Sequence, residues 1–302
     1  MNQDHPVIWK CRDREIHLGS RALIMGILNV TPDSFSDGGR FLTPEKAVER
    51  ALAMETEGAD ILDIGGESTR PGAQAVSVEE ELARVLPVVE AVAGRVKCLI
   101  SVDTSKASVA EKAIGRGAHI VNDVSALSFD PDMARVAGQT GAGVILMHMK
   151  GRPRTMQVNP EYEDVVQEVT GYLQARMDWA CSCGMERESL ALDPGIGFGK
   201  TVEHNLALLA GLDRLIRCGR PVCVGLSRKS FLGKITGGEV SDRLAASLAG
   251  AAYAMAKGAQ IIRVHDVKES CDVARLMSKL ATEELRRAAR EPDSYAGADR
   301  DT

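Results

Sequence analysis

The chain has 302 residues, of which 44% are hydrophobic and 26% are charged, and its formal net charge at pH 7 is −5. This composition is ordinary for a globular protein and provides enough apolar residues for a large core. The acidic balance, and the lack of any long Lys or Arg run in the sequence, argue against nucleic acid or a membrane surface as a partner, because both attract a basic face.

The N-terminal segment MNQDHPVIWK lacks the apolar region of a signal peptide. No apolar stretch reaches the roughly 18 residues that a membrane-spanning helix needs. Seven cysteines are scattered along the chain, and Cys181 and Cys183 are too close together for the usual Cys-x-x-Cys metal or redox pair. We therefore expect reduced thiols and a cytoplasmic protein.

One pattern recurs eight times along the chain: a short apolar run ends, and polar residues capable of catalysis follow at once. The polar segments begin at Asn29, Gly66, Asp103, Asn122, His148, Asp193, Ser227 and His265. Buried strands whose polar residues gather at their carboxyl ends are typical of β/α barrels, in which the strand ends meet in one active site. The pattern therefore indicates an enzyme.

Helical segments separate the strands and carry signals at both ends. Thr43-Pro44 and Asp130-Pro131 each pair a capping residue with Pro, and Ser77 and Glu80 have the spacing of a capping box before a helix that ends near Ala93. Gly-Ala pairs at 58–59, 117–118, 141–142 and 258–259 mark the points where a helix ends and the next strand begins. Gly supplies the left-handed residue that stops a helix.

This alternation predicts an α/β fold, an eight-stranded parallel (β/α)8 TIM-type barrel, with a doubly wound open sheet as the alternative. The segment 6–20 alternates around a charged turn and predicts an N-terminal β-hairpin across the bottom of the barrel. We expect a single domain over residues 1–302, with the barrel at about 20–282. The polar tail 283–302 is expected to be frayed.

Polar loops follow the first and second strands. The loop NVTPDSFSDGG contains Phe35 and Asp37 and is long enough to act as a lid over a substrate. The loop GGESTRPG contains Arg70, and an Arg beside exposed amides suits a phosphate or carboxylate. The alternative for this second loop is that Glu67 and Arg70 pair with each other.

Asp103, Asn122 and Asp193 follow three different strands. Asp accepts hydrogen bonds and Asn both donates and accepts, so together they could bind a flat heterocycle that carries several N–H and C=O groups. A cage for a divalent metal ion is one alternative. The other is a structural role, in which inward-facing polar residues of a barrel satisfy one another.

Cationic residues follow the last two strands. Arg263 and His265 are two residues apart and should face the same side, where they suit a pyrophosphate, and Lys229 lies in the preceding loop SRKS. The segment PGIGFGKT at 194–201 nearly fits a phosphate-binding G-x-x-x-x-G-K-T loop, but Pro194 replaces the first Gly, so an ATPase is disfavoured.

Six motifs closely resemble dihydropteroate synthase of bacterial folate synthesis, a pterin-binding family. They are MGILNVTPDSFSDGG (25–39), GGESTRPG (65–72), SVDTSK (101–106), LDPGIGFGK (192–200), GLSRKSFLG (225–233) and IIRVHDVKE (261–269). The resemblance runs from about residue 8 to about residue 280 and includes motif order and spacing. It implies a transferase that joins 6-hydroxymethyl-7,8-dihydropterin pyrophosphate to p-aminobenzoate and gives 7,8-dihydropteroate and pyrophosphate.

The resemblance also implies a role for each matching residue. The pterin would be bound by Asp103, Asn122, Asp193, Lys229 and Arg263. The pyrophosphate would be bound by Asn29, Thr69, Arg70, Arg263 and His265. The p-aminobenzoate would be bound by Phe35, Thr69, Arg70, Pro71, Lys229 and Ser230. Asn29 would contact Mg²⁺, and the residues acting in catalysis would be Asp37, Asp193, Lys229, Arg263 and His265.

The chemistry of these substrates implies early loss of pyrophosphate followed by attack of the arylamine, with no covalent enzyme nucleophile. The enzyme would position the substrates and stabilise charge. The resemblance further implies inhibition by sulfonamides, which mimic p-aminobenzoate, and a homodimer through late helices. A methyltetrahydrofolate–corrinoid methyltransferase on the same barrel and a non-catalytic homologue that only binds or regulates are the alternatives.

Overall fold

The computed structural model describes residues 7–31, 43–68, 72–153 and 155–290. Its main sheet is parallel and has eight strands. These are β3 (Leu23–Asn29), β4 (Ile61–Gly65), β5 (Leu99–Asp103), β6 (Ile120–Asp123), β7 (Gly143–Met147), β8 (Leu190–Asp193), β9 (Cys223–Gly225) and β10 (Ile261–Val264). Their order in the sheet is β8-β7-β6-β5-β4-β3-β10-β9.

A single bridge joins the two ends of this order. Leu192 of β8 pairs in parallel with Val222, the residue before β9, and the Leu192 N–H donates to the carbonyl of Pro221 at 2.8 Å. The sheet therefore closes on itself. The predicted (β/α)8 barrel is confirmed, and the alternative of an open, doubly wound sheet is wrong.

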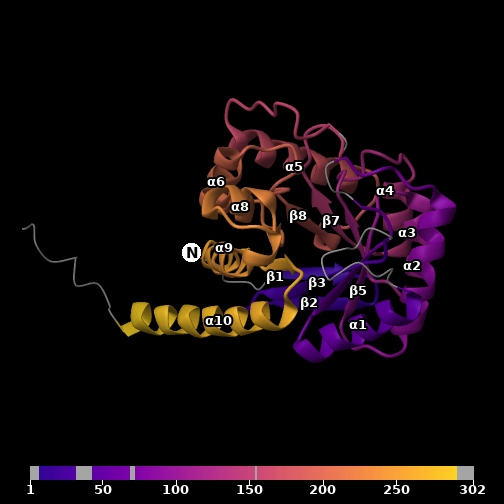
Figure 1. Cartoon of the computed structure of the whole chain (residues 1–302), viewed down its shortest axis with the longest axis horizontal. Helices are drawn as coiled ribbons and strands as arrows, with labels where there is room; N and C mark the ends of the chain where they lie inside the picture. The colour runs from indigo at the N-terminus through magenta and orange to yellow at the C-terminus, as the bar shows by residue number, and fades with distance from the viewer. Residues whose placement is uncertain (1–6, 32–42, 69–71, 154, 291–302) are drawn as a thin grey trace, which may run out of the picture.

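Helices surround the barrel and bury their apolar faces against the outer side of the strands (Figure 1). They are α1 (Pro44–Glu57), α2 (Val78–Ala93), α3 (Ala107–Gly115), α4 (Met133–Thr140), α5 (Val165–Ser182), α6 (Val202–Ala210), α7 (Leu212–Ile216), α8 (Ser230–Thr236), α9 (Leu244–Ala256) and α10 (Val267–Arg290). Two short 3-10 helices, η2 (Arg187–Ser189) and η3 (Val240–Asp242), precede β8 and α9.

Two of the three predicted helix starts are confirmed, and the third is displaced. The side chains of Thr43 and Ser77 accept backbone N–H groups in the first turns of α1 and α2. Helix α4 begins at Met133, two residues later than the Asp130-Pro131 signal suggested. The Asp130 carboxylate divides its oxygens between two segments. One oxygen accepts the N–H of Asp132 at 3.0 Å, and the other accepts the N–H of Ala107 at 2.8 Å and so caps the neighbouring helix α3.

The hairpin of β1 (Val7–Cys11) and β2 (Arg14–Leu18) closes the amino end of the barrel, as predicted. Trp9 is fully buried, and its indole N–H donates to the carbonyl of Ser189 at 2.9 Å. Trp9 packs in one apolar cluster with a residue from every barrel strand. These are Met25, Ile61, Leu99, Ile120, Ile145, Ala191, Cys223 and Ile261. This apolar plug leaves the carboxyl end of the barrel for polar chemistry.

Helix α10 continues to Arg290, beyond the end of the barrel predicted at about 282. Arg286 and Arg287 both pair with Glu283, one turn earlier, at 3.7 and 3.8 Å, and such spacings stabilise an exposed helix. Helix α10 thus includes residues 283–290 of the polar tail that was expected to be frayed, and residues 291–302 lie outside the described part. In Figure 1 the yellow end of α10 extends away from the barrel.

All seven cysteines lie in the described part of the chain and are free thiols, which agrees with the reduced state expected. Burial raises the pKa of the Cys98 thiol to about 12, so this group stays protonated. Among the described helices, none has the length and apolar character needed to cross a bilayer.

Candidate active site

The inside of the barrel changes from apolar to polar along its axis. Side chains alternate along a strand, so residues two positions beyond the apolar plug face the interior again. At that level lie Asp63, Asn122, Asp193 and Arg263. Asn29 and Asp103 lie one further step toward the carboxyl end, paired through Gly65 in the strand register. The fold thus brings six polar residues from six strands into one crater.

A buried ion-pair cluster forms one side of this crater. Arg263 Nε donates to the Asp63 carboxylate at 2.6 Å, and its Nη2 donates to Asp103 at 2.7 Å. The amide of Asn122 donates to the same Asp63 oxygen at 3.2 Å. Asp63 is fully buried and Arg263 keeps 19% of its side-chain surface exposed. A buried charge requires such partners, so this cluster fixes the direction of Arg263.

The titration of the cluster follows from burial and charge. Burial raises the pKa of Asp103 to about 7, although the charge of Arg263 opposes this and Asp63 adds to it. Burial alone would lower the pKa of Arg263, but the charges of Asp63 and Asp103 raise it above its usual range. Arg263 therefore stays cationic, whereas Asp103 can gain or lose a proton near neutral pH.

Asp193 and Lys229 form the opposite side. Asp193 Oδ1 accepts the Gly195 N–H at 2.7 Å, and burial raises the pKa of this carboxyl while the charge of Lys229 opposes the rise. The Lys229 ammonium donates to the carbonyl of Ile196 and lies 4.6 Å from the centre of the Phe198 ring. Burial lowers the pKa of Lys229 to about 8.

The two cationic side chains both lie beside Gly225 at the end of β9. A β-carbon there would lie 3.9 Å from Lys229 Nζ and 3.6 Å from Arg263 Cβ, which are ordinary contact distances. Lys229 and Arg263 therefore approach the same point of the strand. A positive corner thus faces a wall of carboxylates and one amide.

Asn29 stands at the rim of the crater, next to Gly65. A β-carbon at Gly65 would lie 3.6 Å from Asn29 Oδ1 and 3.7 Å from Asp103 Oδ2, so the glycine leaves a hollow between two oxygen donors. Oxygen ligands suit Mg²⁺, which usually keeps water and takes substrate phosphate oxygens as well. The residues at this position therefore fit the predicted Mg²⁺ contact.

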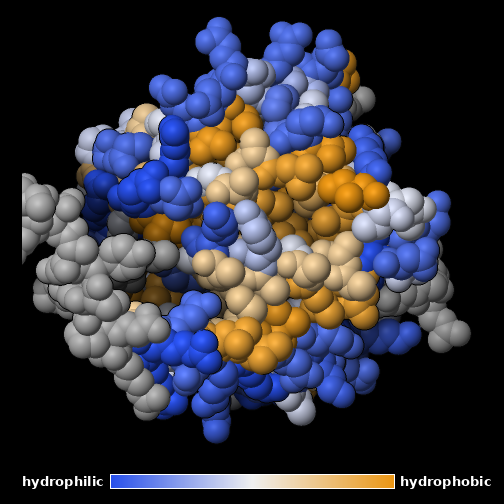
Figure 2. Space-filling model, turned by 90° about the vertical axis from the view of Figure 1, so that its left-hand side faces the viewer, coloured by the Kyte–Doolittle hydropathy of each residue, from blue (hydrophilic) through white to orange (hydrophobic). Residues whose placement is uncertain are grey.

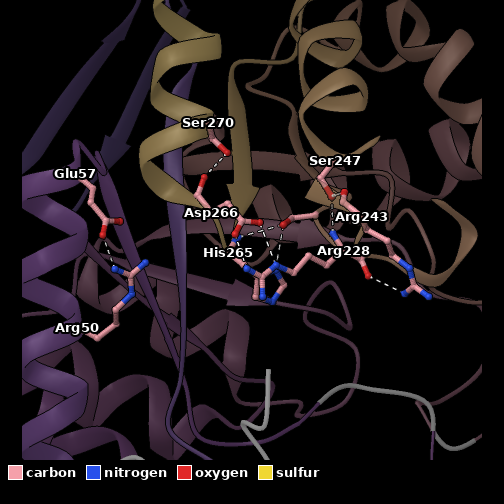
Figure 3. A network of polar contacts seen from close by, with 9 residues as sticks. Arg50, Glu57, Arg228, Arg243, Ser247, His265, Asp266 and Ser270 are labelled. Carbon is pink, nitrogen blue, oxygen red and sulfur yellow. Dashed lines mark hydrogen bonds and ion pairs between the residues drawn. The ribbon is translucent and has the colours of Figure 1, made fainter. Parts of the chain in front are cut away.

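The segment after β9 connects this corner to the last strand. Ser227 Oγ accepts the backbone N–H of His265 at 3.2 Å and lies 3.1 Å from its Nδ1. Arg228 and Asp266 form an ion pair through two nitrogens (Figure 3). Ser230 is exposed and begins α8. His265 and Ser230 thus lie at the rim, while Lys229 points inward.

Several predicted residues lie outside the described part of the chain: Phe35, Asp37, Thr69, Arg70 and Pro71. The described remainder of the second loop bears on the alternative in which Glu67 pairs with Arg70. Glu67 binds Lys106 through one carboxylate oxygen at 2.5 Å and accepts the Val76 N–H at 3.2 Å through the other. Glu67 therefore has partners in Lys106 and Val76.

The sequence interpretation missed Asp63. Its signal was a charge inside the apolar strand segment ILDIG, two residues before Gly65 and hence on the inward side of the strand. It also missed Lys200, which lay in the segment set aside as a false phosphate loop. A charged residue that interrupts a buried strand is informative, because such a group requires a partner.

Lys200 and the segment after β7 form a further buried contact. Lys200 Nζ lies 3.0 Å from His148 Nδ1 and donates to the carbonyl of Phe198 at 2.9 Å. Burial lowers the pKa of His148 to about 3 and that of Lys200 to about 7. His148 packs edge-on against Tyr172, with the two ring centroids 5.0 Å apart.

Comparison with known proteins gives the same assignment. The family model for pterin binding enzymes matches residues 25–265. The dihydropteroate synthase of Haemophilus influenzae is 50% identical over 258 residues, which cover 85% of this chain and 94% of that protein. The chain belongs to the dihydropteroate synthase family. The match spans every strand of the barrel, so it includes all the polar strand ends described above.

Solved structures of dihydropteroate synthases share the fold. That of Yersinia pestis, in complex with a sulfonamide drug, has a TM-score of 0.87 and 44% identity and covers 91% of this chain and 99% of that one. That of Xanthomonas albilineans, in complex with 7,8-dihydropteroate, has a TM-score of 0.81 and 41% identity and covers 91% and 98%. These dihydropteroate synthases favour that activity over the methyltransferase alternative.

Proposed function

We propose that the protein condenses 6-hydroxymethyl-7,8-dihydropterin pyrophosphate with p-aminobenzoate and releases 7,8-dihydropteroate and pyrophosphate. The observation that carries this proposal is the crater in which Asp103, Asn122 and Asp193 face the cations Lys229 and Arg263. Family membership supports it, and so does the 7,8-dihydropteroate bound in the Xanthomonas albilineans relative.

The pterin is held by the buried wall. Carboxylates of Asp103 and Asp193 accept hydrogen bonds from ring N–H and amino groups, Asn122 both donates and accepts, and Lys229 donates to a ring acceptor. Arg263 stacks on the ring. Its edge is already bound by carboxylates, which leaves the faces of the planar guanidinium for a π system.

Arg263, His265 and Asn29 bind the pyrophosphate at the rim in this proposal, and the family resemblance adds Thr69 and Arg70, which lie outside the described residues. Arginine and histidine supply donors that strengthen as negative charge develops on the leaving group. Asn29 would hold Mg²⁺, which would supply positive charge to neutralise part of the negative charge on the leaving group.

The reaction begins with cleavage of the bond between the pterin methylene carbon and the pyrophosphate oxygen. The bonding electron pair leaves with pyrophosphate, and the positive charge left behind spreads into the pterin ring. Asp193 favours this spreading and Asp37 offsets charge at the methylene. The arylamine nitrogen then forms the new carbon–nitrogen bond and loses a proton, so no covalent enzyme intermediate is needed.

The p-aminobenzoate occupies the outer part of the crater. In this proposal the subsite includes Lys229 and Ser230 of the SRKS segment. The family resemblance adds Phe35, Thr69, Arg70 and Pro71 of the two loops, which lie outside the described residues. Ser230 is exposed at the first position of α8, and Lys229 joins the outer subsite to the pterin wall. The sulfonamide drug bound in the Yersinia pestis relative supports an arylamine subsite in this family.

Mass spectrometry of the products tests this function. Purified protein, Mg²⁺ and both substrates should give 7,8-dihydropteroate and pyrophosphate in equal amounts. Omitting p-aminobenzoate should abolish formation of the dihydropteroate. A folded protein that binds the pterin but makes no dihydropteroate would contradict the proposal and favour the binding-only homologue.

We also propose that the protein forms a homodimer through α9 and α10. Both helices expose large apolar side chains: Leu244, Tyr253, Leu276, Leu280 and Leu285. Figure 2 shows apolar surface across the face on which these helices lie. Exposed apolar patches of this kind mark interaction surfaces, and the small residues at 246–256 permit close helix packing.

Light scattering on the full chain tests the dimer. The expected mass is twice that of the 32.4 kDa chain. Leu276→Glu together with Leu280→Glu should give a folded monomer, because two charges on one face of α10 oppose apolar contact. A monomeric wild-type protein at tens of micromolar, roughly the range in which specific homodimers persist, would contradict the proposal.

A further inference from the structure

Arg228 has an unusual backbone conformation at a critical point of the chain. Its φ is +58°, in the left-handed region that residues with a side chain rarely adopt. It lies between Ser227, which contacts His265, and Lys229, which points into the crater. A strained residue persists only where its surroundings hold it, so the neighbours of Arg228 are informative.

Three contacts hold Arg228 in this conformation (Figure 3). Its N–H donates to Ser247 Oγ of α9 at 2.9 Å, and its carbonyl accepts from Arg243 Nη1 at 3.2 Å. Its guanidinium donates two hydrogen bonds to the Asp266 carboxylate, one from Nε at 3.0 Å and one from Nη2. The side chains are 26% and 14% exposed, so this two-point ion pair is well shielded from water.

Asp266 is itself anchored. It directly follows His265, and its carbonyl accepts both the hydroxyl of Ser270 at 2.6 Å and the N–H of Ser270 at 3.1 Å in the first turn of α10. The Arg228–Asp266 pair therefore ties the loop after β9 to the start of α10. Each partner of the pair is the sequence neighbour of a residue proposed to act on substrate, Lys229 in one case and His265 in the other.

We propose that the Arg228–Asp266 pair is a positioning device that sets the directions of Lys229 and His265 together. It links the pterin side of the crater to the pyrophosphate side without touching either substrate group. The inference rests on the proposed roles of Lys229 and His265. Loss of the pair should therefore weaken both halves of the pterin pyrophosphate subsite at once.

Asp266→Asn tests the pair, and Asp60→Asn is its matched control. Asp60 forms a similar two-nitrogen pair with Arg21, part-buried, at the opposite end of the barrel. Asp266→Asn should lower kcat/KM for the pterin pyrophosphate about 10- to 100-fold, whereas Asp60→Asn should stay within about twofold of wild type. Equal kcat/KM in the two folded variants would overturn the proposal.

A second measurement separates positioning from simple loss of stability. Inorganic pyrophosphate probes the His265 side and 6-hydroxymethylpterin probes the Lys229 side. Asp266→Asn should weaken inhibition by both probes, and a variant that loses only one, or neither, would contradict the joint role. Asp60→Asn should lower Tm without changing either inhibition constant.

Arg228→Gly distinguishes the ion pair from the backbone conformation. Gly adopts a φ of +58° without strain but cannot bind Asp266. The kcat/KM of Arg228→Gly for the pterin pyrophosphate should fall as far as that of Asp266→Asn. A wild-type kcat/KM in Arg228→Gly would overturn the inference. If Asp266→Asn does not fold, Arg228→Lys, which keeps the charge but not the two-point contact, replaces it with the same expectations. An inactive wild-type enzyme would instead refute the proposed function.

Discussion

The carboxylate of Asp63 lies 2.6 Å from Nε of Arg263, although 200 residues separate them in the chain. This contact spans the interior of the barrel from β4 to β10. It fixes the guanidinium that we propose stacks on the pterin and faces the leaving group. Asp63 therefore acts on the reaction through Arg263.

Asp63→Asn tests this relationship. The variant keeps the shape of the side chain but removes the charge, so Arg263 is held by Asp103 alone. We expect kcat/KM for the pterin pyrophosphate to fall about 10- to 100-fold, and the free energy of unfolding to fall by roughly 1–3 kcal/mol. Asp213→Asn, in the exposed pair with Arg217, is the control and should match wild type. Wild-type kcat/KM in folded Asp63→Asn would refute the role.

On the opposite side of the crater, Asp193→Asn removes the negative charge of residue 193 but keeps the size of its side chain. Asn can still accept the Gly195 N–H, so the loop after β8 should remain in place and Tm should change little. The charge that favours delocalisation into the pterin is lost, and kcat should fall about 100-fold or more. Single-turnover rates at saturating substrate measure this step. Near-normal turnover would show that Asp193 does not stabilise the developing cation.

The low pKa of Lys229 predicts an alkaline limit to activity. Burial lowers this pKa to about 8, so the donor is charged below that pH and loses its charge as pH rises through it. We expect kcat/KM for the pterin pyrophosphate to fall above about pH 8. Lys229→Arg should reduce overall activity but remove the alkaline fall, because Arg stays charged. An unchanged alkaline limb in this variant would assign the titration to another group.

Sulfonamides should inhibit the protein in competition with p-aminobenzoate. They carry an arylamine para to an acidic group, as p-aminobenzoate does, and the subsite at the two loops and Ser230 should accept them. Initial rates at varied p-aminobenzoate measure the competition. The same benzenesulfonamide without its amine should inhibit less. Full turnover at high sulfonamide and low p-aminobenzoate would contradict the assignment of this subsite.

Removal of Mg²⁺ should stop turnover reversibly. Chelation should abolish release of pyrophosphate, and added Mg²⁺ should restore it. Asn29→Ala should raise the Mg²⁺ concentration needed for half-maximal rate, about 10-fold for the loss of one oxygen donor and its orientation. An Asn29→Ala enzyme with wild-type Mg²⁺ dependence would place the ion elsewhere.

The fold was predictable because two sequence signals mark each barrel strand: an apolar run and a polar residue at its carboxyl end. Asp103, Asn122, Asp193 and Arg263 are among these polar residues, and the structure places all four on the inner side of the barrel. Their mutual contacts were not predictable. No local sequence signal pairs Arg263 with Asp63, because the two residues come together only when the barrel closes.

Other features depended on context beyond the local pattern. Asp130-Pro131 has the composition of a helix start, but Asp130 caps α3 because tertiary packing brings Ala107 to its carboxylate. The polar segment that begins at residue 283 was expected to be frayed, whereas α10 runs to Arg290 and Glu283 pairs with Arg286 one turn later. The left-handed φ of Arg228 has no signature in sequence, since Arg rarely adopts it.

Release of pyrophosphate that depends on p-aminobenzoate tests the central claim most directly. The crater formed by the barrel strand ends should support full turnover, with pyrophosphate and 7,8-dihydropteroate formed in equal amounts, only when pterin pyrophosphate, p-aminobenzoate and Mg²⁺ are all present. Asp193→Asn should be folded and nearly inactive in the same assay. Release at the wild-type rate in Asp193→Asn, or no release by folded wild-type protein, would contradict the account.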